Sequence, residues 1–395
     1  PLKVGEKISN YHYSSDIMMG EFARIYSFFN DLDLYFRFYP ILFSFLIGLT
    51  VYVFASRRWN KKTAYWAMFF NYFAGSFAYW VLLFRGKFIF AGETLFWASQ
   101  SNTILGNPPH TMGIILLTAV IFLLEIYRQQ KNLKWLILML LIGMGLTTFK
   151  VSAGGVLIAG ILSVGGYLLV FKRKWKFMIY AVLISGLNYL FLRIISPQAG
   201  SFLIFEPFWF PATMMIELLG INKWALRRQH YLAVDTLGSK GYLAWEYGKA
   251  TAIFILGNTG ARIIGLYSII KKIFKGIDIV DVFMGAGMVV SLGILLVFVQ
   301  KGIAYNLIQF MQIYFHFLGF YAGAAVALMI KNINKNKGKI LFAVLIIVLT
   351  IPTTIGNLYQ WYAPGKKASA VITNEELKAM DWIKKNTKEE ALFLT

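Results

Sequence analysis

His12 and Asp16 lie four positions apart near the start of the sequence, in Asn10-Tyr-His-Tyr-Ser-Ser-Asp16. A helix would place both side chains on one face. An imidazole and a carboxylate placed in this way can bind a divalent cation such as Mg or Mn, hold a sugar hydroxyl or take part in catalysis. The alternative is a solvated His–Asp pair on an interfacial helix. We predict a catalytic or metal-binding role for this pair.

Five further side chains are candidates for binding a substrate, namely His110, Lys150, Arg193, Glu206 and Arg262. His110 follows Pro108 and Pro109, which predict an extended approach to an apolar segment and a position near a membrane interface. Lys150 and Arg193 stand at the ends of apolar segments, where a cation could hold a lipid-linked phosphate. The alternatives are a capping or turn role for His110 and snorkelling of both cations to lipid headgroups.

Arg262 lies inside an apolar segment that ends near Lys271. Inserting a guanidinium there costs roughly 2.5 kcal/mol or more, so this side chain needs a partner. Asn258 is one helical turn away, and Asp281 is a candidate for an ion pair. We expect a structural ion pair or contact with a carrier phosphate, at a depth nearer the cytoplasmic end of the segment.

A polar band of amides runs toward a fourth histidine in the last third of the chain: Gln300, Lys301, Asn306, Gln309, Gln312 and His316. Such a band in an apolar region more often lines a cavity than faces lipid. For His316 itself, we expect a hydrogen-bonded packing role.

Several kinds of chemistry are excluded because the chain contains no cysteine. A disulfide, a thiolate nucleophile and a Cys-based zinc site are therefore ruled out. The sequence also lacks a Walker motif, an HExxH motif and a nucleophile elbow. Any chemistry must come from scattered acidic and basic groups.

The elements that position these groups are long apolar segments. Of the 395 residues, 58% are hydrophobic and only 14% are charged, against about 25% charged residues in soluble domains. We predict an all-α polytopic membrane protein with about ten spans, at 36–56, 63–84, 110–127, 135–149, 152–171, 177–195, 248–270, 279–300, 308–330 and 340–356. The fourth segment is short for a span.

Every second loop between these segments is strongly basic, and together these loops explain most of the net charge of +21. The basic loops follow the first, third, fifth, seventh and ninth segments. The positive-inside bias places them in the cytoplasm and places residues 1–35, 85–109, 196–247, 301–307 and 357–395 outside the cytoplasmic membrane. The charge therefore indicates topology in a lipid bilayer, and no nucleic acid partner is expected.

The two ends of the sequence indicate a piece of a longer protein. Residues 1–356 form the predicted transmembrane domain, truncated at its N-terminus. Thr373 and Glu376 match a capping box that begins an amphipathic helix, and residues 391–395 resemble the start of a strand. Residues 357–395 are therefore expected to begin a truncated extracytoplasmic α/β domain.

Four segments together resemble a known group of enzymes: Pro1 to Asp16, Gly257-Asn-Thr-Gly-Ala-Arg262, Gln300-Lys-Gly-Ile-Ala-Tyr-Asn306 and Ile351-Pro-Thr-Thr354. In this order they are similar to GT-C-like polytopic membrane glycosyltransferases, in an uncharacterised bacterial group that uses polyprenyl-phosphate sugars. The resemblance implies transfer of a hexose or pentose from a polyprenyl-phosphate carrier to a glycan or protein acceptor outside the membrane, often with a divalent cation. It also implies a catalytic base in the first outer loop, upstream of Pro1.

Two other functions fit the same sequence. A transporter or flippase of lipid-linked sugars would need the polar band at 300–316 to continue across the membrane. A non-catalytic relative could instead help to assemble other cell-envelope enzymes.

Overall fold

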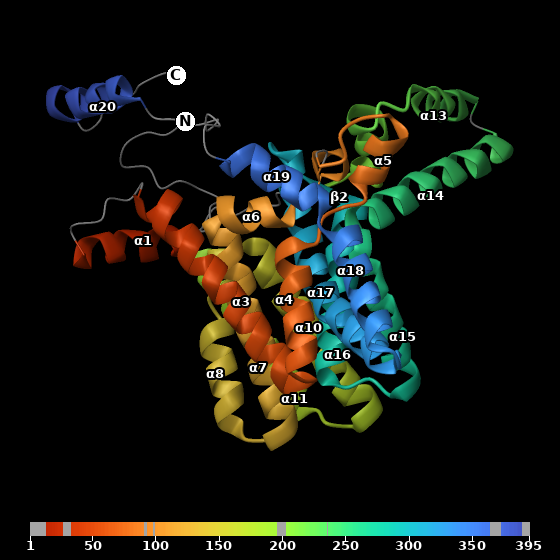
Figure 1. Ribbon diagram of the computed structural model, residues 1–395. Helices are drawn as coiled ribbons and strands as arrows, with labels where there is room; N and C mark the ends of the chain where they lie inside the picture. Colours follow the sequence, from red (N-terminus) through yellow and green to blue (C-terminus); the bar gives the residue numbers. More distant parts are fainter. Residues whose placement is uncertain are drawn as a thin grey trace.

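The computed structural model describes residues 13–26, 33–90, 93–97, 99–195, 203–234, 236–363 and 373–388. These residues form a bundle of long helices with shorter helices at one end (Figure 1). The strands in this part of the chain are β1 (Leu203–Phe205) and β2 (Phe298–Gln300), which pair antiparallel with Leu203 opposite Gln300.

In the described part of the chain, seven helices or helix runs are long and apolar enough to cross a membrane, so this is a multi-pass membrane protein. They are η1–α3 (Leu34–Arg58), α7 (Pro108–Gln130), α10 (Val151–Lys172), α11 (Lys176–Ile195), α14–η4–α15 (Leu237–Lys275), α16 (Ile279–Val297) and η5–α17 (Ala304–Asn332). The α14–η4–α15 run consists of α14 (Leu237–Thr259), η4 (Gly260–Ile264) and α15 (Gly265–Lys275). In the η5–α17 run, α17 is Ile308–Asn332.

Two further predicted spans are bent helix pairs. The helix α4 (Lys61–Phe73) meets α5 (Ala78–Phe84) at 56°, and α18 (Asn336–Thr350) meets the apolar part of α19 (Pro352–Tyr362) at 45°. Pro352 explains the second bend because its ring cannot continue the preceding helix. Counting each pair as one span gives nine spans among the described residues, so the predicted ten are not confirmed.

The fourth predicted segment is a shorter apolar unit, Leu133–Phe149, made of α8 (Leu133–Gly143) and α9 (Leu146–Phe149). It ends where Asn188 of α11 accepts from the backbone N–H of Thr147 and donates to the carbonyl of Gly143. The break between α8 and α9 is therefore held by a side chain from a neighbouring helix.

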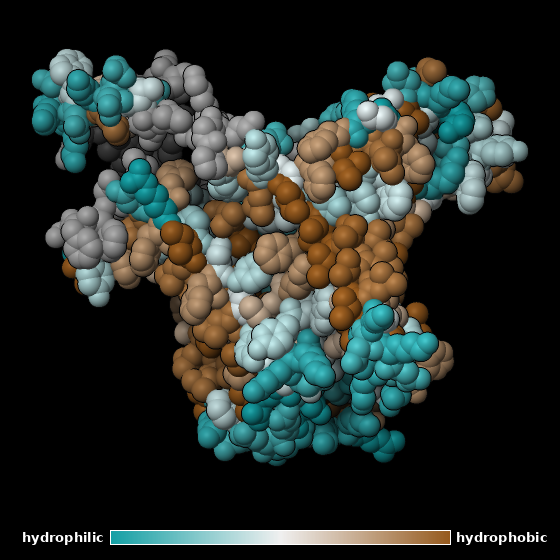
Figure 2. Space-filling view, viewed as in Figure 1, coloured by the Kyte–Doolittle hydropathy of each residue, from teal (hydrophilic) through white to brown (hydrophobic). Residues whose placement is uncertain are grey.

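The helix α17 forms the centre of the bundle, and its side chains are buried from Gln309 to Val326. Gly319 and Gly323 allow α4 to approach closely, because a methyl group at Gly323 would lie 2.5 Å from the backbone nitrogen of Ala67. Apolar side chains such as Ile41 of α3 and Leu341 of α18 are exposed on the outside of the bundle. Figure 2 shows a brown, apolar band across the helices. Such a band is suited to contact with lipid tails.

The five basic loops lie at one end of the bundle, which we call the basic end: 57–62, 128–134, 172–176, 271–278 and 331–339. Arg57 donates to Gln129 at 2.8 Å, and Arg58 contacts Asp278 at 3.1 Å. Figure 2 shows hydrophilic residues gathered there, below the apolar band. The sequence predicted that every second loop between the apolar segments is basic. The structure agrees with this alternation, because successive helices run in opposite directions and bring these loops to the same end.

The other end, which we call the opposite end, carries the shorter elements: α1 (Ser14–Ile25), η2 (Glu93–Phe96), α6 (Gln100–Gly106), α12 (Trp209–Thr213), η3 (Met214–Leu218) and α13 (Asn222–Val234). The apolar segment around Pro207 and Pro211 forms β1, α12 and η3 at this end. At the C-terminus, α20 (Asn374–Asn386) begins with the predicted capping box of Thr373 and Glu376, which is confirmed. The predicted strand at 391–395 lies outside the described residues, so the α/β domain stays a prediction.

Candidate functional site

Asp16 lies on α1. At the opposite end of the bundle, this helix packs against α7 and α9. Ser14 forms a 2.5 Å hydrogen bond with Thr148, and Asp16 shares a small cavity with Pro108 and Pro109. Burial raises the pKa of the Asp16 carboxyl above its ordinary value, against the opposing effect of a backbone hydrogen bond. Its Oδ2 atom is buried and has no hydrogen-bond partner among the described residues.

His12, the other half of the predicted pair, lies outside the described residues. The structure therefore gives no geometry for a His12–Asp16 cation site. Within the described ranges, no group of three or more His, Asp and Glu side chains could hold a metal ion.

His110 and Lys150 belong to the same end of the bundle as Asp16, because α1 packs against both α7 and α9. The backbone N–H of His110 donates to the Asn107 side chain at 3.2 Å, so Asn107 caps α7 and the His110 side chain is buried in the first turn. One turn further, a methyl group at Gly113 would lie 2.9 Å from Cβ of Lys150, so the Lys150 stem packs directly on α7. We call Asp16, His110 and Lys150 the opposite-end cluster.

Lys150 occupies the turn between α9 and α10, and its side chain is buried. This burial lowers the pKa of Lys150 to about 8. A buried ammonium in this position would gain from an anionic ligand, because the ligand would offset the cost of removing the charge from water.

Arg193 and Glu206 do not belong to this buried group. Arg193 is exposed on α11, where its Nε donates to the Tyr189 hydroxyl at 3.0 Å and its guanidinium lies 5.4 Å from the ring centroid. Glu206 is exposed after β1, and its backbone N–H donates to the carbonyl of Val297 at 2.9 Å.

Arg262 is fully buried and fills the break between α4 and α5. It donates to the carbonyls of Ala74 and Gly75 and, at 2.5 Å, to Oε1 of Gln100. Its guanidinium also lies 4.4 Å from the ring centroid of Phe315. These partners hold the bend of the α4–α5 pair against α6.

Two expectations for Arg262 are therefore wrong. Its predicted ion-pair partner Asp281 binds Arg58 at 2.6 Å instead. Arg262 also lies toward the opposite end, where α6 and the α4–α5 break meet, and not nearer the basic end. The α4–α5 bend places the buried carbonyls of Ala74 and Gly75 within reach of the Arg262 guanidinium, and no pattern along the sequence indicated this bend.

His316 has the hydrogen-bonded packing role that the sequence indicated. Its Nε2 lies 2.7 Å from the Thr118 hydroxyl, and its Nδ1 lies 2.7 Å from Oδ1 of Asn71. Three helices, α17, α7 and α4, are joined through this one ring.

An aromatic group at the opposite end was missed by the sequence analysis. Trp97 stacks on Tyr305 with ring centroids 4.4 Å apart, and Trp209 lies 5.2 Å from the same tyrosine. Trp97 has a φ of 73°, in the left-handed region that bulky residues rarely adopt. Such backbone strain is concentrated at functional sites. The three rings come from segments far apart in the sequence, so spacing carried no signal for them.

Amides of the predicted polar band lie beside Tyr305. Asn306 donates to Gln300 at 2.9 Å and accepts from Gln309 at 2.7 Å. Further along α17, Gln312 donates to Thr103 of α6 at 2.5 Å. The band therefore begins at the surface of the opposite end and enters the bundle.

Comparison with known protein families and with curated proteins found no match for this chain. What the structure itself establishes is the class: a multi-pass helical membrane protein whose short helices gather at the end away from its basic loops.

Proposed function

We propose that this chain is a membrane glycosyltransferase of the GT-C-like kind, which transfers a sugar from a polyprenyl-phosphate carrier at the opposite end of the bundle. The observation that carries the proposal is the opposite-end cluster: a half-buried carboxylate on α1, which packs against α7 and α9, and a buried imidazole and a buried lysine at the ends of these helices. The positive-inside bias assigns this end to the outer face.

The proposed reaction assigns one task to each member of the cluster. Asp16 takes the proton from the acceptor hydroxyl, and a carboxyl with a raised pKa is better suited to this task than a fully solvated one. The acceptor oxygen then bonds to the anomeric carbon as the bond from that carbon to the carrier phosphate breaks. Lys150 stabilises the charge that develops on the departing phosphate, and His110 forms part of the wall.

The aromatic group of Trp97, Trp209 and Tyr305 supports a sugar as the substrate. Aromatic faces pack against the apolar faces of sugar rings, and neighbouring amides donate to and accept from hydroxyls. Arg193 and Arg262 are left out of the proposed phosphate site. Arg193 is exposed on α11, and Arg262 is already bound by carbonyls and by Gln100.

The test is sugar transfer from a labelled polyprenyl-phosphate donor by the purified full chain. Asp16→Asn should lower the rate by at least about a hundredfold, the usual contribution of a general base. Lys150→Gln should raise the KM for the carrier by roughly tenfold or more, because a charge-assisted hydrogen bond contributes about 1.5–3 kcal/mol. Arg193→Gln is the control and should retain activity. If the wild type transfers the sugar and both Asp16→Asn and Lys150→Gln retain its full activity, the assigned site is wrong.

A second candidate, transport of lipid-linked sugars, is favoured by one observation. Polar side chains continue along α17 from Gln309 through Gln312 and His316 to Tyr321, whose hydroxyl donates to Asp281 at 2.9 Å. The same protein in sealed vesicles would distinguish the two functions. A transporter would move the labelled lipid between leaflets and leave its sugar attached.

A further inference from the structure

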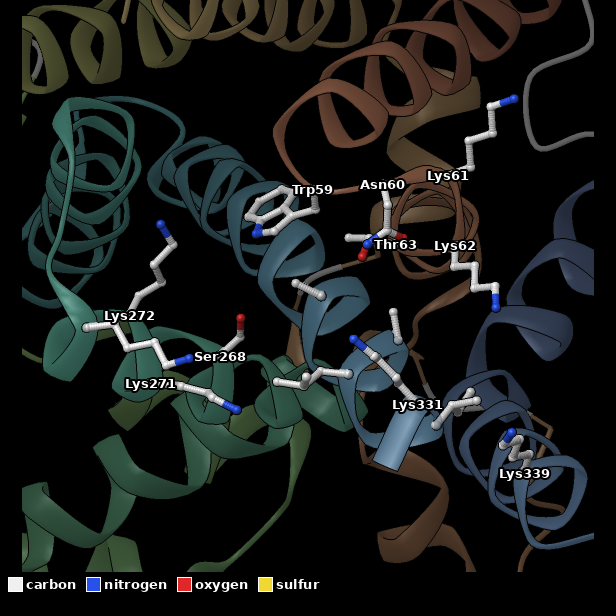
Figure 3. A pocket seen from close by; sticks show the side chains of 15 residues that line it. Trp59, Asn60, Lys61, Lys62, Thr63, Ser268, Lys271, Lys272, Lys331 and Lys339 are labelled. Atoms are coloured by element: carbon white, nitrogen blue, oxygen red, sulfur yellow. Dashed lines mark hydrogen bonds between the residues drawn. The ribbon is translucent and has the colours of Figure 1, made fainter. Parts of the chain in front are cut away.

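A groove at the basic end encloses a volume of about 860 Å³. Its walls come from the start of α4, from α15, from the last turns of α17 and from the start of α18. Figure 3 shows lysine side chains from all four helices around this groove. The groove lies at the basic end of the bundle, whereas the opposite-end cluster lies at the opposite end. Ligand binding in the groove therefore does not depend on the proposed transferase activity.

The groove has a concentrated positive charge. Lys272 has acidic neighbours, Asp281 at 3.3 Å and Asp278 at 3.7 Å. The other lysines of the lining have no acidic partner within the described residues: Lys61, Lys62, Lys271, Lys275, Lys331 and Lys339. No aspartate or glutamate belongs to the lining.

The adjacent Arg58 differs from most of the groove lysines, because acidic side chains surround it. Arg58 contacts Glu125, Asp278 and Asp281, and its side chain is only 2% exposed. These carboxylates of the basic end are thus concentrated around one arginine, and of the groove lysines only Lys272 has acidic neighbours within the described residues. Lysines that only oriented the chain in a membrane would not need to line one cavity.

The N-terminus of α4 adds to the same field. Lys61 and Lys62 are its first two residues, its first turn has no acidic residue, and Asn60 caps it by accepting from the N–H of Thr63. Cations in the first turn are unfavourable beside the positive end of the helix dipole. An anion bound at this N-terminus would interact favourably with the helix dipole and with both lysines.

One wall of the groove is apolar. Ala324, Ala327 and Leu328 of α17 line it, with Trp59 at the end nearer α3. Lysines beside an apolar wall match a molecule that has an anionic head and a hydrocarbon part.

We propose that this groove binds a phosphate ester carrying at least two negative charges, with the phosphate held by lysines of α4, α15 and α17. A lipid headgroup and a free phosphorylated compound share this chemistry. In the lipid case, the acyl chains lie along the apolar wall of α17.

The test compares two triple variants that remove the same charge. Lys61→Gln, Lys271→Gln and Lys331→Gln together empty the groove of three lysines, and Lys172→Gln, Lys174→Gln and Lys176→Gln remove three exposed lysines from the loop between α10 and α11. Thermal unfolding of the full chain in neutral detergent is followed with dioctanoyl phosphatidic acid, dioctanoyl phosphatidylcholine or inorganic pyrophosphate. A further variant, Lys271→Gln alone, replaces the groove triple if that triple unfolds.

Phosphatidic acid should raise the Tm of the wild type in a saturable manner, and phosphatidylcholine should not. The groove triple should bind at least tenfold more weakly, Lys271→Gln alone should show a smaller loss, and the loop triple should match the wild type. Binding of pyrophosphate with the same dependence on the groove would identify a free phosphate as sufficient, and binding of the lipid alone would identify a headgroup. Equal behaviour of the two triples, or the absence of saturable binding, would overturn the proposal.

Discussion

Arg58 at the end of α3 contacts Asp281 in the first turn of α16 at 2.6 Å, although 223 positions separate them in the chain. The same guanidinium contacts Glu125 of α7 at 2.8 Å, and Asp281 also accepts from Tyr321 of α17. Four helices therefore meet at one buried arginine. The arrangement satisfies each charge by contact with an opposite charge away from water.

Replacing Arg58 by Met should strongly destabilise the protein. Removing one partner from a buried ion pair leaves uncompensated charges and costs about 3–5 kcal/mol. The measurement is equilibrium unfolding of the purified protein in detergent. Arg57→Met is the matched control, because Arg57 is exposed and its side chain donates a hydrogen bond to a neutral partner, Gln129. Equal losses in the two variants would contradict a structural role for the Arg58 network.

Asp278 should make stability depend on acid pH. Burial alone would raise the pKa of this carboxyl, but the charge and hydrogen bond of Arg58, with the charge of Lys272, hold it below its ordinary value. A lowered folded-state pKa stabilises the protein above the ordinary carboxyl pKa of about 4. That contribution is lost as the pH falls through the folded pKa.

Comparing Tm values at pH 7 and at successively lower pH would measure this effect. Asp278→Asn keeps a side chain able to cap α16 and removes the titration. The wild type should lose more stability on acidification than this variant. Parallel pH profiles would show that the Asp278 carboxylate contributes nothing.

Gly260, between α14 and η4, should tolerate no side chain. Its φ of 57° and ψ of −147° are adopted almost only by glycine, and an added Cβ would collide with the carbonyl oxygen of Gly75. Gly260→Ala should therefore cost about 1–3 kcal/mol in unfolding free energy. Gly285→Ala on α16 is the control, with open space around the added methyl, and should be neutral or stabilising by up to about 1 kcal/mol. A neutral Gly260→Ala would contradict the described backbone.

The sidedness of the bundle can be tested directly because the chain has no native cysteine. Asn132→Cys lies at the basic end and Asn222→Cys at the opposite end, both at exposed positions. In intact cells, an impermeant thiol reagent should label the Asn222 variant and spare the Asn132 variant. The reverse pattern would place the opposite-end cluster in the cytoplasm and remove the proposed outer-face reaction.

The sequence alone was sufficient for features that depend on local composition. Apolar length and alternating basic loops predicted a multi-pass helical protein with the basic loops at one end, because each apolar segment of adequate length partitions into lipid largely by itself. The capping box at Thr373 was also readable, since its partners are three residues apart. His316 was correctly expected to be hydrogen-bonded within the bundle.

Partners between distant segments came only from the tertiary structure. Asp281 was a candidate ion-pair partner for Arg262, whereas packing brings Asp281 to Arg58 and gives Arg262 the carbonyls of a helix bend together with Gln100. The stacking of Trp97 on Tyr305 and the meeting of Asp16 with the start of α7 arise in the same way. A buried charge or ring binds whichever group the helix packing places within a few ångströms, and that choice depends on bends and crossing positions that no single segment encodes.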